Sequence, residues 1–307
     1  MAAPVASVKL RHTMPATKTP APIKPLRGVR ILSLALNVPG PAALMRLRAM
    51  GATCTKIEPP AGDPMGLYNA SAFATLHEGV KRLSLDLREP DGQRLLHRQL
   101  ARTDVLLSSF RPSGLARLGL DWKTLHRRYP ALSQVAIVGS HGARAEEPGH
   151  DLTYMAEMGL VTGIELPPSL YADMGGSLMA AEAVLKVVLQ RQRSATGVYL
   201  EVALASAAAY LGLPHSWGMT RPGGAVGGAH AGYRIYPCRD GRVAVAALEP
   251  HFAAALCQAA GVAVVDRRTM LAAATHAAVA RFLAGQTCAQ LDALGAARDI
   301  PFHTLPT

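Results

Sequence analysis

The stretch RGVRILSLALNVPGPAALMRLRAMGATCTKIEPP, residues 27–60, decides the fold. Residues 29–36 form an apolar run of strand length, and the turn at 37–41 places proline at the start of a helix. A helix is predicted over 42–50 because a glycine follows it, and a second strand is predicted over 53–57. The order strand, helix, strand is typical of a βαβ unit.

The same alternation continues along the chain. Further strands are predicted at 82–87, 104–110 and 132–139, with helices at 90–102 and 122–128. Strands that alternate with helices at this spacing form parallel sheets, because each helix carries the chain back across the sheet. We therefore expect an α/β fold whose large domain contains a doubly wound, mainly parallel, Rossmann-like sheet.

One motif of dinucleotide-binding sheets is missing. The sequence Gly-x-Gly-x-x-Gly should follow the first strand, but Pro39-Gly40-Pro41 stands there instead. The glycines at 223–228 do not lie between a strand and a helix of a βαβ unit. The sequence therefore argues against a conventional NAD or FAD enzyme.

The second half of the chain has a different pattern. A long apolar helix is predicted over 173–193, followed by a strand over 199–203 and a buried helix within 202–213. Two strands at 233–238 and 242–248 read as a hairpin. Helices are then predicted at 251–260, 276–284 and 288–296. These elements predict a smaller α+β domain.

Residues 1–25 differ from the rest in composition, since proline, alanine, threonine and lysine dominate without periodicity. A targeting peptide would also be basic and poor in acids, but the prolines interrupt the amphipathic helix that it needs. We interpret 1–25 as a disordered leader, with targeting as the minor alternative. A large α/β domain is expected over 26–198, and a linker with the small domain over 199–307.

Composition excludes several classes of protein. Half of the residues are hydrophobic and the mean hydropathy is +0.16, so a folded core is expected, yet no apolar run reaches the length of a membrane span. The 4 cysteines are far apart and form no Cys-x-x-Cys pair. This spacing argues against a metal site and a secreted disulfide scaffold, and it favours a reducing, cytoplasmic location.

The net charge of +11 is unevenly distributed. Residues 1–30 hold 6 basic and no acidic side chains, so the other 277 residues carry 26 basic and 21 acidic ones. Aromatic residues make up only 5% of the chain, and no basic run interrupts its body. This distribution argues against a nucleic-acid partner and suits a small phosphorylated ligand.

Two aspartates precede predicted helices: Asp151 and Asp173. The simpler interpretation makes each an N-cap. The functional alternative uses the free N–H groups and the dipole of a helix N-terminus, which stabilise an oxyanion, with the glycines at 175–176 admitting a ligand to the backbone. If His150 and Asp173 flank one cavity, one base can remove a proton from carbon and the other can return one.

Four further charged residues are candidates for the site. Glu249 precedes a predicted helix, where it either complements the helix dipole or orients an imidazole. Arg111 follows a strand, at the edge where open α/β sheets bind ligands, and is placed to meet phosphates. Lys81 and Arg82 stand at a strand start, so they reach that edge only if the preceding loop folds back. A solvated surface is the alternative for all three basic residues.

In their order along the chain, these motifs resemble those of one family, the class III CoA-transferases (CaiB/BaiF type), which include α-methylacyl-CoA racemase. The resemblance covers about residues 26–305. It rests on LRGVRILSL at 26–34, PGP at 39–41, MGATCTKIEPPAGDP at 50–64, KRLSLDLREPDG at 81–92, TDVLLSSFRPSGLARLGLD at 103–121, PGHDLTYMAEMGL at 148–160, YADMGGSLMAAEAVL at 171–185 and LEPHF at 248–252.

The resemblance implies a two-domain fold in an interlocked homodimer, a coenzyme A thioester as substrate and no prosthetic group. In the transferase branch, the residue at the position of Asp173 is the nucleophile that carries the acyl group. In the racemase branch, His150 and Asp173 are the two bases that exchange the α-proton, and Asp151 and Glu249 match the supporting acids. Many transferases have an aromatic residue in place of His150, so the motif favours exchange of the α-proton of a 2-methylacyl-CoA.

The sequence departs from the family pattern at several points. Glu58-Pro59-Pro60 is transferase-like, Ser108-Ser109 replaces a common Glu-Asn pair, and Arg48 stands where an acid is usual. Relatives also continue past the position of Pro306 and return a segment to the large domain. Two alternatives therefore stay open: CoA transfer to a carboxylic acid through an Asp173 anhydride, and a CoA-binding protein without turnover.

Overall fold

The computed structural model describes residues 23–263 and 268–307, so all but the last three residues of the predicted leader lie outside the described residues. The chain forms two compact units. Among the described residues, the first unit comprises 23–146 and 176–202, and the second comprises 147–175 and 203–307. The segment 147–175 thus groups with the C-terminal part of the chain.

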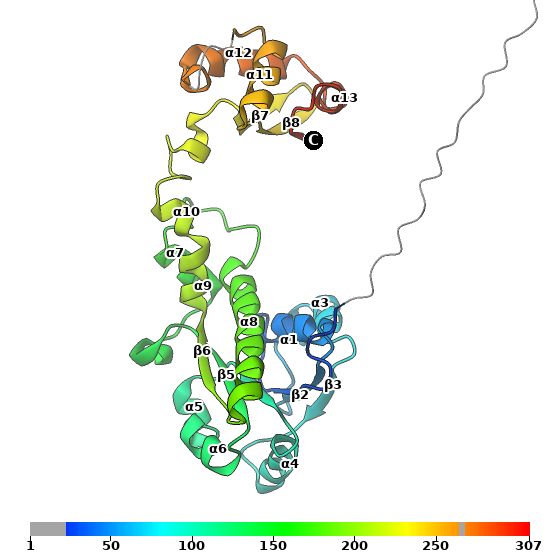
Figure 1. Cartoon of the computed structure of the whole chain (residues 1–307), viewed down its shortest axis with the longest axis vertical. Helices are drawn as coiled ribbons and strands as arrows, with labels where there is room; N and C mark the ends of the chain where they lie inside the picture. The colour runs from blue at the N-terminus through cyan, green and yellow to red at the C-terminus, as the bar shows by residue number, and fades with distance from the viewer. Residues whose placement is uncertain (1–22, 264–267) are drawn as a thin grey trace, which may run out of the picture. The chain divides into compact units, whose positions relative to one another are not determined.

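The first unit contains a six-stranded sheet in the order β3-β2-β1-β4-β5-β6. Neighbouring strands from β3 to β5 pair in parallel, which confirms the predicted doubly wound α/β fold (Figure 1). The chain reverses its direction of travel across the sheet between β1 and β4, which creates a topological switch point. The strands are β1 (Arg30–Ser33), β2 (Thr53–Glu58), β3 (Lys81–Ser84), β4 (Val105–Ser108), β5 (Ser133–Val138) and β6 (Tyr199–Ala203).

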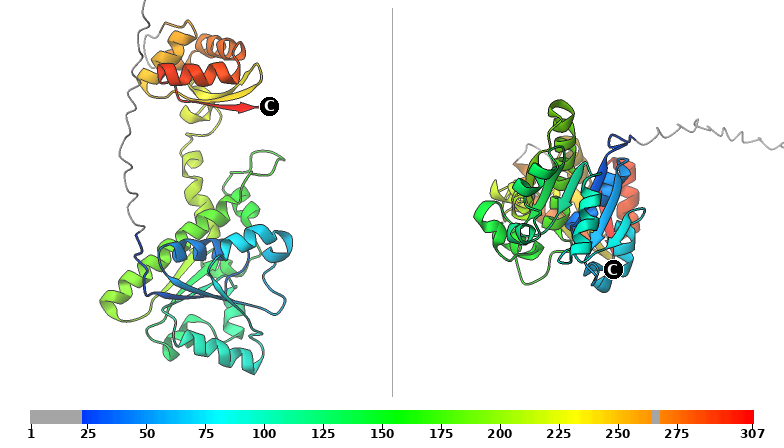
Figure 2. Two further views of the ribbon diagram at one scale, coloured as in Figure 1. Left: turned by 90° about the vertical axis from the view of Figure 1, so that its right-hand side faces the viewer. Right: turned by 90° about the horizontal axis from the view of Figure 1, so that it is seen from below.

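Helices cover both faces of this sheet: α1 and α3 lie on one side, and α4 lies on the other (Figure 2). All residues of β4 and β5 are buried, as expected for strands covered on both faces. Within the described ranges, no helix, including α8 with its 24 residues, has the length and apolarity needed to cross a membrane. The helices are α1 (Pro39–Ala49), α2 (Met65–Tyr68), α3 (Ala70–Leu76), α4 (Pro90–Leu100), α5 (Pro112–Arg117), α6 (Trp122–Arg128) and α8 (Tyr171–Ser194).

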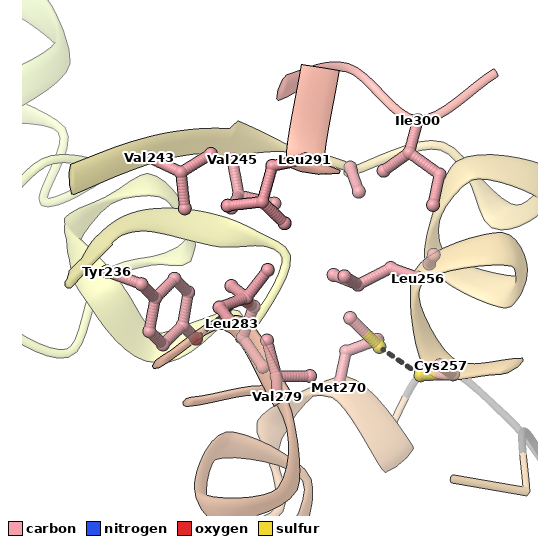
Figure 3. Close-up of a cluster of buried hydrophobic side chains, with 13 residues drawn as sticks. Tyr236, Val243, Val245, Leu256, Cys257, Met270, Val279, Leu283, Leu291 and Ile300 are labelled. Atoms are coloured by element: carbon pink, nitrogen blue, oxygen red, sulfur yellow. Dashed lines mark hydrogen bonds between the residues drawn. The ribbon is translucent and has the colours of Figure 1, made fainter. Parts of the chain in front are cut away.

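The second unit contains α7 (Asp151–Glu157), α9 (Leu204–Leu211) and α10 (Leu213–Ser216), followed by an antiparallel sheet in the order β7-β8-β9. The predicted hairpin is β7 (Tyr233–Cys238) and β8 (Gly241–Ala246), and β9 (Phe302–Pro306) extends it to three strands. Figure 3 shows side chains of the sheet and its helices, including Tyr236 and Leu283, meeting in one core. The helices are α11 (Pro250–Ala259), α12 (Ala273–Ala284) and α13 (Cys288–Arg298).

Candidate active site

His150 stands at the N-cap of α7 with an extended backbone. Its backbone is fixed by Thr153: the His150 N–H donates to the Thr153 hydroxyl at 3.1 Å, and that hydroxyl donates to the His150 carbonyl at 2.8 Å. The residue is exposed. The contacts with Thr153 therefore hold the His150 backbone in place at an exposed position at the start of α7.

Asp151, the first residue of α7, is buried, and its carboxylate does not cap that helix. Its Oδ1 instead accepts a hydrogen bond from the backbone N–H of Asp173 at 2.9 Å. Asp173 is the third residue of α8. Neither aspartate is thus an N-cap, which differs from the simpler interpretation of the sequence. The two carboxylates are instead brought together from the starts of two helices.

The pKa of the Asp173 carboxyl is raised from 3.8 to about 6. Burial is the largest cause, the neighbouring Asp151 charge raises the pKa further, and His150 partly opposes both effects. An acid with this pKa exchanges protons readily near neutral pH, and when ionised it is a poorly solvated carboxylate. Asp173 can therefore act as a general base or as a nucleophile.

Two glycines of the candidate motifs, Gly149 and Gly175, allow other residues to pack closely against the backbone. A Cβ on Gly149 would lie 2.4 Å from the Tyr154 hydroxyl, so the tyrosine ring requires a residue without a side chain there. A Cβ on Gly175 would lie 3.1 Å from Leu211 and 3.4 Å from Ala207 of α9. Gly175 therefore lets α8 approach α9 closely, whereas the sequence suggested that this glycine admits a ligand.

Glu249 is the N-cap residue of α11, is exposed, and makes no side-chain capping bond. This position agrees with the predicted helix start. Its role in orienting an imidazole stays a prediction.

A pocket of about 570 Å³ lies in the first unit. Its lining includes residues at or just after the carboxyl ends of β1, β2, β3 and β4, which is where open α/β sheets bind ligands. Its walls are mainly apolar, including Leu34, Ile57 and Phe110. Two basic residues, Arg88 and Arg117, and two acidic ones, Glu58 and Asp86, also line it, and the Arg88 guanidinium donates hydrogen bonds to the Asp86 carboxylate at 3.0 Å and 2.7 Å. Its size is within the ~300–1,000 Å³ usual for small-molecule sites.

The three predicted basic residues are not among the residues that line this pocket. Arg111 is the exposed N-cap of α5, one residue beyond the lining Phe110. Lys81 and Arg82 occupy the amino end of β3, and the Arg82 guanidinium lies 5.0 Å from the ring centre of Phe73. Arg88 was missed, although its place after the predicted third strand is a signal that marks the carboxyl edge.

A buried ionic cluster adjoins the pocket through Glu58. The Lys56 ammonium is fully buried, forms a short ion pair with Asp63, and lies 3.5 Å from Glu58, a lining residue. The Nε2 atom of His77 is 2.9 Å from the same ammonium, and burial lowers the pKa of that imidazole. A neutral His77 is therefore the partner that accepts a hydrogen bond from Lys56.

The structure thus defines an α/β protein that has a doubly wound sheet without a dinucleotide motif, a pocket at the switch point of that sheet and a half-buried aspartate with a raised pKa. The chain belongs to CoA-transferase family III, since the model of that family matches residues 26–307.

Curated relatives include both branches of reaction. The chain is 32% identical over 257 residues to alpha-methylacyl-CoA racemase of Mus musculus, covering 77% of this chain and 65% of the racemase. It is 32% identical over 200 residues to succinyl-CoA--D-citramalate CoA-transferase of Chloroflexus aurantiacus, covering 60% of this chain and 50% of that protein. The chain therefore spans one half to two thirds of the length of these relatives.

A solved structure extends the likeness to the fold. The chain superimposes on the crystal structure of Rv3272 from Mycobacterium tuberculosis with a TM-score of 0.81 and 27% identity, covering 93% of this chain and 84% of that one. Rv3272 is named a probable fatty acyl-CoA transferase, and over the 208 residues aligned by sequence, 52% of its length, the identity is 31%.

Proposed function

We propose that the protein is an acyl-CoA enzyme with a racemase-like site, in which His150 and Asp173 exchange the α-proton of a 2-methylacyl-CoA thioester. The observation that carries the proposal is the environment of Asp173: burial and Asp151 raise its pKa to about 6, and His150 is close enough to oppose the shift. A pair of acid–base groups can alternate as proton donor and acceptor.

The chemistry needs two different states of the pair. One base, unprotonated, removes the α-proton and leaves a thioester enolate, and the other, protonated, returns a proton to the same carbon. The exposed His150 imidazole and the half-buried Asp173 carboxyl suit the two roles in either direction. Within the first unit, the pocket that Arg88 and Arg117 help to line is the candidate for binding coenzyme A phosphates.

A second candidate function is CoA transfer to a carboxylic acid, favoured by the named transferases among the relatives. The Asp173 carboxylate would attack the thioester carbonyl, so that an acyl anhydride forms and CoA thiolate leaves. The thiolate would then attack the aspartyl carbonyl, which releases the first carboxylate and leaves an enzyme CoA thioester for the acceptor acid. A buried, weakly solvated carboxylate is a better nucleophile than an exposed one.

Incubation of the protein with a 2-methylacyl-CoA in heavy water tests the proposal. Deuterium should enter the α-carbon with the wild type, and the rate should fall by ~10²–10⁴-fold in both His150→Ala and Asp173→Asn. His141→Ala is the matched control, because His141 is an exposed histidine of the first unit that pairs with Glu201.

Two other outcomes would each support one of the alternative functions. If hydroxylamine traps an acyl-enzyme with wild type and with His150→Ala, but not with Asp173→Asn, the protein is a transferase. If coenzyme A raises the melting temperature while no acyl-CoA is exchanged or transferred, the protein binds CoA without turnover, and the racemase proposal fails.

A further inference from the structure

Two cysteines and an aspartate meet at one end of the antiparallel sheet in the second unit. Cys238 is the last residue of β7, and Cys288 is the first residue of α13. Their Sγ atoms are 3.6 Å apart, although 50 residues separate them in the chain. Oδ1 of Asp240 lies 3.9 Å from the Cys238 Sγ, and the three atoms all lie within 4.8 Å of one another.

Backbone hydrogen bonds hold the three residues in place. Cys238 pairs with Gly241 at the hairpin turn, which fixes Asp240 between them. The Asp240 Oδ1 accepts a hydrogen bond from the Cys288 N–H at 2.7 Å, and the Arg239 N–H donates to the carbonyl of Gln286 at 2.8 Å. The arrangement is therefore built into the fold and does not depend on flexible side chains finding one another.

We propose that Cys238, Asp240 and Cys288 form a binding site for a soft divalent cation of the Zn²⁺ class. Tetrahedral coordination with Zn–S bonds of ~2.3 Å places two sulfur ligands ~3.8 Å apart, and a Zn–O bond of ~2.1 Å places oxygen ~3.6 Å from sulfur. The observed separations of 3.6 Å and 3.9 Å need only small adjustments. Two thiolates and a carboxylate select such an ion over Mg²⁺ or Ca²⁺.

Exposure fits the same assignment. Cys288 is buried and Cys238 is half-buried, so an ion could reach the site from the side of Cys238. The three residues would fill three of the four positions of a tetrahedral ion and leave the fourth for water. Zinc binds cysteine as the thiolate, so metal binding releases the protons of the thiol groups.

The ion would link the β7–β8 hairpin to the start of α13. Both elements enclose the core that contains Val243 and Leu291. The site therefore has a structural role and is independent of the proposed acyl-CoA chemistry. The sequence argued against any metal site because its cysteines form no closely spaced pair, yet folding brings two of them together.

Zinc titration of the reduced, metal-free full chain tests the assignment, with calorimetry in two buffers to count protons. We expect one Zn²⁺ per chain, about two protons released per ion, and a higher melting temperature. Cys238→Ser and Cys288→Ser should each weaken binding by at least ~100-fold, and Asp240→Asn by ~10-fold or more. Cys257→Ser is the matched control, since Cys257 is a buried cysteine of the same core whose Sγ faces Met270.

Unchanged zinc affinity in Cys238→Ser, or no binding by the reduced wild type, overturns the proposal. A Cys238–Cys288 disulfide found by mass spectrometry after treatment with a low-molecular-weight disulfide, together with no zinc binding by the reduced chain, also overturns it and identifies a redox pair instead. Circular dichroism shows whether each variant folds. If Cys288→Ser does not fold, the zinc affinity of Cys238→Ser decides the test, because the Cys238 side chain is the less buried of the two.

Discussion

The backbone N–H of Asp173 donates a hydrogen bond to the side chain of Asp151, 22 residues earlier in the chain, at 2.9 Å. This bond ties the first turn of α8 to the start of α7. After burial, the negative charge of Asp151 is the second cause that raises the pKa of Asp173.

Asp151→Asn should lower the pKa of Asp173, because the amide oxygen still accepts the backbone hydrogen bond while the negative charge is removed. If Asp173 must be ionised to act, the acidic limb of the pH profile of kcat/KM moves to lower pH. Asp121→Asn, which removes an acid from the N-cap of α6, is the control and should leave the profile unchanged. An acidic limb that stays in place with Asp151→Asn contradicts this coupling.

Asp173→Asn should stabilise the protein at neutral and alkaline pH. The folded pKa of about 6 exceeds the ordinary 3.8, so the folded state binds the proton more tightly and wild-type stability falls as pH rises between these values. The advantage of the variant should reach at most roughly 3 kcal/mol above pH 6 and vanish below pH 4. Urea unfolding at several pH values measures it, and an advantage independent of pH would exclude titration of Asp173 as its cause.

Gly149→Ala should destabilise the second unit and disturb His150. The added methyl group would meet the Tyr154 hydroxyl at 2.4 Å, so the ring or the loop must move. We expect a loss of ~1–3 kcal/mol in the free energy of unfolding. Gly163→Ala is the matched control, because no atom lies within 4 Å of its added methyl group. Equal effects of the two substitutions would rule out the contact with Tyr154.

Arg88→Ala should weaken binding of coenzyme A more than Lys81→Ala. Arg88 lines the pocket at the carboxyl end of the sheet, while Lys81 starts β3 at the other end. For an exposed cation near a phosphate, we expect a Kd higher by roughly 2- to 10-fold, with less difference at high salt. Calorimetry with coenzyme A at two salt concentrations measures it. A larger effect of Lys81→Ala would restore the assignment made from the sequence.

Lys56→Ala should cost about 3–5 kcal/mol of stability, because it leaves the buried Asp63 carboxylate without its cation. The double variant Lys56→Met, Asp63→Leu should recover part of the loss, since the Asp63 charge is removed together with its cation and Glu58 keeps its contact with Arg82 at 3.9 Å. Lys123→Ala is the control, because Lys123 is exposed on α6. A double variant less stable than Lys56→Ala would show that the other contacts of Asp63 dominate.

The strands of the parallel sheet were predictable because long apolar runs such as 104–110 have few other stable arrangements. The ends of the strands were less predictable: β1 ends at Ser33 and β3 at Ser84, although the residues that follow, Leu34 and Leu85, are also apolar and line the pocket. The short helix α3 was missed because its capping residue, Asn69, has no periodic apolar stretch after it. The strand β9 was missed because its five residues alternate too briefly to stand out.

The candidate site could be predicted from the sequence only where its residues are neighbours in the chain. The motif at 149–151 placed His150 and Asp151 correctly at the start of a helix, but the bond from Asp173 to Asp151 depends on tertiary packing. The cluster around Lys56 was not predictable, because a lysine in a strand gives no sign that an acid seven residues later will be buried with it. Contacts between distant residues, such as Cys238 and Cys288, follow from the fold alone.

The Asp63 carboxylate also accepts hydrogen bonds from the backbone N–H groups of Asn37, after β1, and Met65, at the start of α2. Together with the ion pair between Asp63 and Lys56, these bonds connect the carboxyl ends of β1 and β2 to each other. The protein at this edge of the sheet therefore needs little ordering when a ligand binds. Most of the conformational entropy lost on binding would be lost by the ligand. Affinity at this edge should accordingly respond more to the rigidity of the ligand than to that of the protein.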